Sequence, residues 1–270
     1  MTTELTVLSY NTLFGGADGA SRERAELQIK VINERRPDVF LMQEAKGFES
    51  NGSELLYDLE RRIGMRGFLA LAPHTGQNVA IFIRAPLRPV AFTIDSTHFH
   101  HASATLKVVV AGGQALTLMS AHLCPTGVAV RRREASYLAP LATPDAWTLL
   151  AGDFNSASPH DPEPGDFSEL PAHHRARYIA DDFAGVDRSV LRQLEFAGWT
   201  DIGAKLGGAG APTVPAAGFA GTEFATMRCD YLLASRALAE HARRYEVICT
   251  PDTDAASDHY PIVATFALPT

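Results

Sequence analysis

The chain has 270 residues, 46% of them hydrophobic, and its 24 basic and 31 acidic side chains give a formal net charge of −7. This length and apolar content allow a full hydrophobic core, which excludes general disorder. The acidic balance disfavours a protein whose main task is sequence-independent binding of nucleic-acid backbones, since such binding rests on Lys and Arg contacts. A nuclease stays open, because local basic patches or metal ions can offset the balance.

The cysteines and the terminus bear on the compartment. Cys124, Cys229 and Cys249 cannot form a closed set of disulfides and lack the spacing of zinc ligands. The N-terminal residues show no signal peptide, and no apolar run approaches the roughly 20 residues that cross a bilayer. We therefore expect a cytoplasmic protein with reduced thiols and no transmembrane segment. Without a repeat or a recognisable linker, we expect one domain over residues 1–270, and a monomer.

In the first half of the chain, apolar runs alternate with helical patterns. A helix is predicted over residues 21–36, which begin with a capping serine and end before Pro37, and a second over 53–63. Strands are predicted for five apolar runs: residues 5–10, 38–42, 79–83, 106–110 and 116–119. The last two of these flank a glycine-containing hairpin turn.

The second half continues the alternation, and strands outnumber helices overall. Helices are predicted around residues 130–141 and 187–197, with a short one over 238–243, and surface loops over 156–177 and 207–221. The predicted strands are residues 147–150, 231–233, 245–249 and 261–266. Because hairpin links mix with helical crossovers, the pattern favours a two-layered β core with helices outside it over a doubly wound parallel sheet.

Polar residues stand at or just beyond the ends of several predicted strands. A strand end can hold side chains rigidly at the edge of a core, where chemistry is often placed. Each residue alone is a weak indication, because Asn and Asp are also common turn residues. Six motifs follow one another in the chain: Ser9-Tyr10-Asn11, Gln43-Glu44, Ser120-Ala121-His122-Leu123, Gly152-Asp153-Phe154-Asn155, Arg228-Cys229-Asp230-Tyr231 and Ser257-Asp258-His259.

Taken together, these motifs make the chain resemble the endonuclease/exonuclease/phosphatase superfamily, from Asn11 to His259. That superfamily includes DNase I-like nucleases, abasic-site endonucleases, inositol polyphosphate phosphatases, neutral sphingomyelinases and deadenylases. The resemblance implies an α+β fold, a four-layered α/β/β/α sandwich of two mainly antiparallel sheets flanked by helices. It also implies a Mg²⁺-dependent phosphoester hydrolase, with Mn²⁺ as a substitute, in which water attacks phosphorus.

The resemblance assigns three residues to the metal. Mg²⁺ prefers one or two carboxylates together with waters and phosphate oxygens. Glu44 would be the ligand, Asn11 would support the metal or the phosphate through its amide, and Asp258 would serve a second metal position or hold a water ligand. The plain alternatives are a surface acid for Glu44 and a turn residue for Asn11.

It assigns four further residues to catalysis. Asp153 would orient and deprotonate the attacking water, and Asn155 would donate to a phosphate oxygen. His259 would contact the phosphate, with Asp230 fixing its tautomer from a neighbouring strand. The alternative for the Asp153 motif is an Asx turn after a strand.

His122 separates branches of the superfamily. The abasic-site branch carries a tyrosine at this strand end, whereas the DNase I, phosphatase, sphingomyelinase and deadenylase branches carry a histidine. Gln77 stands where DNase I-like nucleases have a glutamate; it could accept a hydrogen bond from His122 but supplies no charge, so general-acid behaviour by that route is not supported. Asn78 and Arg228 are candidate substrate-binding residues, since Arg228 shares a face with Asp230 if that segment is a strand.

Other polar residues are weaker candidates. The histidine-rich tract 97–101 and the arginines 131–133 are expected on the surface, although one arginine could reach a substrate phosphate. His160, His173 and His174 could line a substrate entrance or lie in solvent. Cys124 and Cys229 are expected to be small packing residues.

The substrate stays open between two classes. The acidic balance and the lack of a basic stripe slightly favour a small-molecule or lipid phosphoester over DNA or RNA. A catalytically silent binding protein on the same fold is the alternative of another class, and the complete set of motif residues disfavours it.

Overall fold

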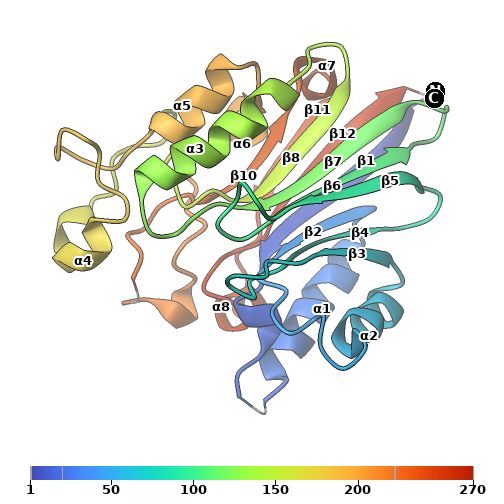
Figure 1. The fold of residues 1–270 in the computed structure, drawn as a ribbon, viewed down its shortest axis with the longest axis horizontal. Helices are drawn as coiled ribbons and strands as arrows, with labels where there is room; N and C mark the ends of the chain where they lie inside the picture. Colours follow the sequence, from blue (N-terminus) through green and yellow to red (C-terminus); the bar gives the residue numbers. More distant parts are fainter. Residues whose placement is uncertain (1, 20, 222, 270) are drawn as a thin grey trace.

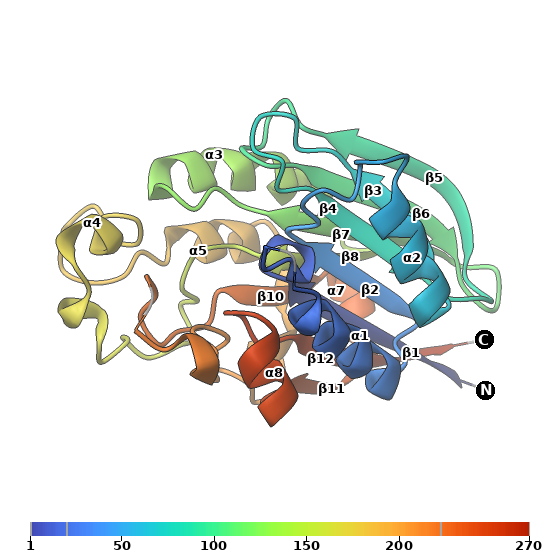
Figure 2. The ribbon, with the colours of Figure 1, turned by 90° about the horizontal axis from the view of Figure 1, so that it is seen from below.

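Two six-stranded sheets pack face to face, with helices outside each of them (Figures 1 and 2). The computed structural model describes residues 2–19, 21–221 and 223–269. Each sheet contains one parallel pair, β1 with β2 and β7 with β8, and its other paired neighbours are antiparallel. The expected four-layered sandwich of two mainly antiparallel sheets is therefore confirmed.

The first sheet has the strand order β11-β12-β1-β2-β4-β3 and the second β5-β6-β7-β8-β10-β9. The strands of the first are β1 (Thr2–Asn11), β2 (Val39–Gln43), β3 (Arg66–Ala70), β4 (Val79–Ile83), β11 (Ala242–Val247) and β12 (Ile262–Pro269). Those of the second are β5 (Arg88–Asp95), β6 (Ser103–Val109), β7 (Ala115–His122), β8 (Trp147–Asp153), β9 (Thr200–Asp201) and β10 (Asp230–Ala234).

Helices α1 (Glu23–Arg35) and α2 (Glu54–Ile63) cover the outer face of the first sheet, and α3 (Val128–Leu138) and α5 (Ser189–Phe196) cover that of the second (Figure 1). The shorter helices are α4 (Ala172–Arg175), α6 (Ile202–Lys205), α7 (Arg236–Ala239) and α8 (Pro251–Ala256). No helix within residues 2–19, 21–221 and 223–269 is long and apolar enough to cross a bilayer.

Alternation along the strands builds the core between the sheets. Val7, Leu41 and Ile81 of the first sheet and Leu118 and Leu149 of the second are all buried in one apolar cluster. Because side chains of a strand alternate between its faces, the neighbouring residues of the same strands face the helices instead. Full burial of each aliphatic side chain contributes about 1.5–3 kcal/mol, so this layer fixes the two sheets against each other.

Several elements differ from the sequence prediction. Strands β3, β5 and β9 and helices α6 and α8 were not predicted, and β11 begins at Ala242 instead of residue 245. Pro89 lies within β5, next to a register shift between Pro89 and Ala91. Because β5 is an edge strand of its sheet, a missing backbone N–H is tolerated there.

The register of the central strands brings the motif residues to one edge of the sandwich. Asn11 pairs with Gln43, just before Glu44, and Asp153 lies between His122 on β7 and Asp230 on β10. The two chain termini lie together at the opposite end, away from α4 (Figures 1 and 2). The polar edge is therefore free of the termini.

Gly152 allows β7 and β8 to approach closely at this edge. Its φ is +146°, and a Cβ atom there would lie 1.8 Å from the carbonyl oxygen of Ala121. A side chain at this position would force the strands apart. The glycine before Asp153 therefore sets the contact between Asp153 and His122.

Candidate active site

A cleft of about 420 Å³ opens at the polar edge. Six candidates predicted from the sequence line it: Glu44, His122, Asp153, Asn155, Asp258 and His259. Asn11 and Asp230 are buried and hydrogen-bonded to these lining residues. Eight of the ten predicted site residues therefore come together, from both sheets and from opposite ends of the chain.

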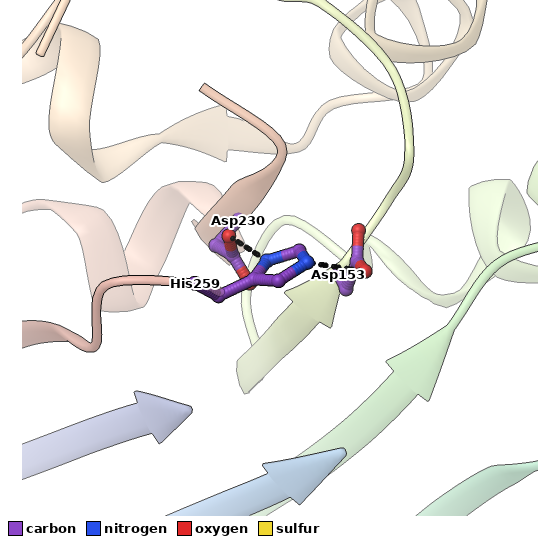
Figure 3. Close-up of side chains that lie close together, drawn as sticks. All are labelled: Asp153, Asp230 and His259. Atoms are coloured by element: carbon purple, nitrogen blue, oxygen red, sulfur yellow. Dashed lines mark hydrogen bonds and ion pairs between the residues drawn. The ribbon is translucent and has the colours of Figure 1, made fainter. Parts of the chain in front are cut away.

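His259 lies between two aspartates (Figure 3). Its Nδ1 is 2.8 Å from Oδ2 of Asp230, and its Nε2 is 3.6 Å from Oδ2 of Asp153. All three residues are buried. Burial alone would lower the pKa of His259, but the charges of Asp230 and Asp153 outweigh burial and hold it well above the usual value. The imidazole is therefore a cation with Nε2 directed at Asp153.

Both carboxylate oxygens of Asp153 accept hydrogen bonds. The backbone N–H of Asn155 donates to Oδ1 over 2.8 Å, and the amide of Asn11 donates to Oδ2 over 3.0 Å. Nε2 of His122 is 3.3 Å from the same Oδ2. Burial raises the pKa of the Asp153 carboxyl above its usual range, although the charge of His259 and the hydrogen bonds from Asn155 and Asn11 oppose this effect. A raised pKa makes the carboxylate a better proton acceptor.

Glu44 follows β2 in a left-handed backbone conformation, with φ of +60°. Its Oε1 accepts from the Asn11 amide over 3.2 Å, and its Oε2 accepts from the Phe14 backbone N–H over 3.0 Å. Such a φ is uncommon for a residue with a side chain and is often found where function requires it. These contacts aim the carboxylate into the cleft.

Glu44 and Asp258 place two half-buried carboxylates on the same cleft. The pKa of Glu44 is raised to about 7, mainly by burial and secondly by the charge of Asp258. Within the described residues, neither carboxylate forms a salt bridge to a Lys or Arg. Two carboxylates on one cleft, with no Lys or Arg partner among the described residues, fit a hard divalent cation.

A second group could also hold a metal ion. Asp153, Asp230 and His259 each offer a ligand atom, and these atoms lie within 4.8 Å of one another. In the described structure these atoms instead form the hydrogen bond from His259 to Asp230 and the ion pair from His259 to Asp153 that Figure 3 draws. An imidazolium cannot ligate a metal, so a metal here would require His259 to lose its proton.

His122 is oriented by a second histidine. The rings of His101 and His122 stack with centroids 4.3 Å apart, and burial lowers the pKa of His122 to about 3. His122 is therefore neutral and not a cationic acid. Among the described residues, His122 Nδ1 and Gln77 Oε1 have no hydrogen-bond partner, so the expected bond between them is not formed.

The structure does not bring Arg228 into the cleft. Its buried guanidinium donates to both carboxylates of Asp161 and Asp201, over 2.7–3.0 Å. With its donors used by two aspartates, Arg228 is a structural cation that ties loop 156–177 to the segment near β9. The interpretation of Arg228 as a phosphate ligand is corrected accordingly.

Asn78 likewise points away from the cleft. Its amide donates to the carbonyl of Ala45 over 3.1 Å and to Glu49 over 2.5 Å, and its Oδ1 accepts from the backbone of Ala72 over 2.8 Å. Asn78 therefore braces the turn that follows Glu44, and its side chain is not free to bind substrate.

Two of the weaker candidates, His101 and Arg131, lie differently from expectation. His101, from the histidine-rich tract, is buried and lines the cleft, and His173 and His174 line it too, whereas His160 pairs with Glu195 outside it. Arg131, expected on a solvated helix face, is buried and donates to Ser156, to the Cys124 carbonyl and to the Arg177 carbonyl.

Sequence reasoning missed Phe14, Arg177, Glu223 and Phe224 in the cleft lining. The ring of Phe224 meets that of His259 edge-on, with centroids 5.3 Å apart. These residues sit in loops outside any motif, where no hydrophobic period places a side chain.

Comparisons with known proteins agree with this geometry. The model of the Endonuclease/Exonuclease/phosphatase family matches residues 8–259. The chain belongs to this family. Members of the family are phosphoester hydrolases, and the matched range contains every predicted site residue. No curated protein sequence matches the chain.

Solved structures of the family share the fold. An AP endonuclease from Archaeoglobus fulgidus has a TM-score of 0.68 and 20% identity, over 97% of this chain and 99% of its own. D. rerio TDP2, complexed with single-strand DNA product, has a TM-score of 0.67 and 19% identity, over 98% and 99%. A mannosyl-6-phosphatase from Bacteroides thetaiotaomicron has a TM-score of 0.67 and 17% identity, over 96% and 98%. At these identities the likeness shows the fold alone.

Proposed function

We propose that this protein is a Mg²⁺-dependent phosphodiester hydrolase, with Mn²⁺ as a substitute, that acts on a small-molecule or lipid phosphoester. The observation that carries the proposal is the placement of Asp153, backed by the Asp230–His259 pair, on the same cleft as the carboxylates of Glu44 and Asp258. Asp153 and His259 offer a base and a cation, and Glu44 and Asp258 offer ligands for a metal.

The charges of the lining support the need for a metal ion. Four carboxylates, of Glu44, Asp153, Glu223 and Asp258, face the cleft, against the cations of Arg177 and His259. An anionic phosphoester would be repelled by this excess of negative charge. A divalent cation bound here would supply the missing positive charge and stabilise the negative charge that develops on the phosphoryl and leaving oxygens.

The protein's own residues supply the rest of the chemistry. Asp153 accepts the proton of the attacking water, and its position is fixed by Asn11, Asn155 and the two histidines. His259, kept cationic by Asp230, stabilises charge on the phosphoryl oxygens. Asn155 uses one amide N–H on the Leu123 carbonyl over 3.1 Å and has a second for a phosphate oxygen. Glu44 and Asp258 would hold the cation, because His259 is paired with Asp230 and Asp153.

Nucleic acid is the competing substrate. Arg177 is the one Lys or Arg side chain that faces the cleft in the described residues, and Glu223 neutralises it. A groove that follows a nucleic-acid backbone requires several free cations. The lining therefore favours a small or lipid substrate, for a protein that we expect to be a cytoplasmic monomer.

Hydrolysis of bis(p-nitrophenyl) phosphate by purified protein tests the proposal. We expect release of p-nitrophenolate with Mg²⁺ or Mn²⁺ and none with EDTA. A parallel panel of nucleic acids, phospholipids and sugar or inositol phosphoesters identifies the class, with the highest kcat/KM expected outside the nucleic acids. Absence of turnover on the whole panel would show a silent binding protein, and the highest kcat/KM on DNA or RNA would overturn the substrate class.

A further inference from the structure

Arg177 and Glu223 form an ion pair on the lining of the cleft. The arginine side chain is 15% exposed and the glutamate side chain 44%. Nδ1 of His174 lies 3.7 Å from the same carboxylate. Within residues 2–19, 21–221 and 223–269, Arg177 is the only Arg that faces the cleft. Its partner, the carboxylate of Glu223, is the more solvent-accessible of the two side chains.

The guanidinium of Arg177 is held in place independently of Glu223. Its Nε donates to the carbonyl of Pro125 over 2.8 Å, and its own backbone carbonyl accepts from the buried Arg131 over 2.6 Å. The guanidinium also lies over the ring of Tyr178, at 5.2 Å from the centroid. Removal of Glu223 from the pair would therefore leave a fixed and uncompensated cation facing the cleft.

The Phe224 ring lies next to both this cation and the catalytic histidine. The guanidinium carbon of Arg177 lies 6.0 Å from the centroid of the Phe224 ring, and the His259 ring lies 5.3 Å from it. An anionic group that Arg177 binds would therefore lie close to the phosphoryl group at His259.

We infer that Arg177 binds a second anionic group, a phosphate, on a small substrate, and that Glu223 occupies this position until the substrate displaces it. The inference rests on the proposed phosphoester hydrolysis and narrows its substrate to molecules with two phosphate groups. Displacement is feasible because a partly exposed salt bridge contributes little to stability, whereas a guanidinium binds phosphate through paired, charge-assisted hydrogen bonds.

The chain contains a matched control pair. Arg188 pairs with Glu163 over 3.0 Å, with side chains 14% and 49% exposed, close to the values for Arg177 and Glu223. Neither Arg188 nor Glu163 lines the catalytic cleft. Arg188→Gln and Glu163→Gln therefore reproduce the loss of a similar ion pair without touching the proposed subsite.

The test compares thymidine 5′-(p-nitrophenyl phosphate) with and without a 3′-phosphate, in the presence of Mg²⁺. We expect Arg177→Gln to raise KM at least tenfold for the bisphosphorylated ester and less than threefold for the other. Glu223→Gln should lower KM for the bisphosphorylated ester several-fold, and both control variants should match the wild type. Because Glu223→Gln should improve binding, misfolding cannot produce the expected result.

Three outcomes would overturn the inference: equal effects of Arg177→Gln on both esters, no effect of Glu223→Gln, or the same changes in the control variants. Turnover of bis(p-nitrophenyl) phosphate is measured alongside, so that a failure of the proposed function is recognised separately by its absence. Competition distinguishes the source of the second phosphate. Thymidine 3′,5′-bisphosphate should inhibit as well as a five-residue oligothymidylate does, and inhibition by the oligonucleotide alone would contradict a small substrate.

Discussion

Nδ1 of His259 lies 2.8 Å from Oδ2 of Asp230, although the two residues come from different sheets of the sandwich. From the sequence we expect Asp230 to reach His259 from a neighbouring strand. In the structure Asp230 begins β10 in the second sheet, and His259 precedes β12 in the first. The hydrogen bond therefore joins the two β layers at the edge that carries the cleft, and it depends on the packing of the whole sandwich.

This pair should behave as one catalytic unit. Asp230→Asn and His259→Ala should each lower kcat by about 100-fold or more, because either change removes the fixed cation at the phosphate. The double variant should lose little beyond the larger single loss. Steady-state kinetics of the three variants, with thermal unfolding as the control for folding, checks this, and losses that multiply would refute the unit.

Asp153→Asn should remove the proton acceptor while keeping the shape of the side chain. We expect kcat to fall by at least 100-fold while KM stays within about threefold of the wild type, since the metal and phosphate contacts remain. Saturation kinetics on bis(p-nitrophenyl) phosphate separates the two constants. A rise in KM with unchanged kcat would make Asp153 a binding residue.

Asp201→Asn should lower stability and leave catalysis intact. Arg228 and Asp201 are both buried, and the change removes one of the two carboxylates that compensate the guanidinium. Because Asp161 stays paired with Arg228, we expect a loss smaller than that for a fully unpaired buried charge, which costs about 3–5 kcal/mol of the free energy of unfolding. Urea unfolding measures this loss, and kcat/KM per folded molecule should match the wild type. Loss of turnover without loss of stability would return Arg228 to the substrate-binding residues.

His101 should make the protein less stable in acid. Burial, followed by the charges of His122 and His100, lowers the pKa of His101 to about 2, and its Nδ1 lies 2.8 Å from the Thr75 hydroxyl. The unfolded chain binds a proton below about pH 6.5 that the folded chain does not, so stability falls as pH drops through that value, by up to about 1.4 kcal/mol per pH unit.

The variant His101→Phe keeps a stacking ring and removes this titration. Between pH 6.5 and pH 5, its free energy of unfolding should fall by about 1.5 kcal/mol less than that of the wild type. Urea unfolding at both pH values measures the difference. Parallel pH dependence of the two proteins would show that His101 does not carry the effect.

The motifs identified eight residues that lie together in the structure, because order along the chain and strand-end position are visible in a sequence. Arg228 was misplaced because its face was judged from a two-residue spacing to Asp230, whereas β10 begins only at Asp230. Its partners Asp161 and Asp201 lie 67 and 27 positions away, and no local pattern connects them. Arg177 and Phe224 were missed for the same reason, since loop packing alone brings them to the cleft.

The fold was predicted where hydrophobic runs were continuous. Strands β2, β4 and β8 are buried along their whole length and read as apolar runs. Edge strand β5 is mostly exposed and contains a proline, so its sequence resembles a loop. Strand β3 is fully buried only at Ala70, so its sequence lacks an apolar run. Its extended conformation follows from pairing with β4.

The most direct test of the account is the Mg²⁺ dependence of bis(p-nitrophenyl) phosphate hydrolysis by the wild type and by Glu44→Gln after removal of metal. Glutamine keeps the shape of the side chain but removes a charge from the cation site. We predict no turnover by either protein without metal, restoration of the wild type by Mg²⁺, and a loss of at least 100-fold in Glu44→Gln at limiting Mg²⁺, with partial recovery at high Mg²⁺. Full wild-type turnover in EDTA, or near-normal turnover of Glu44→Gln at limiting Mg²⁺, would contradict the account.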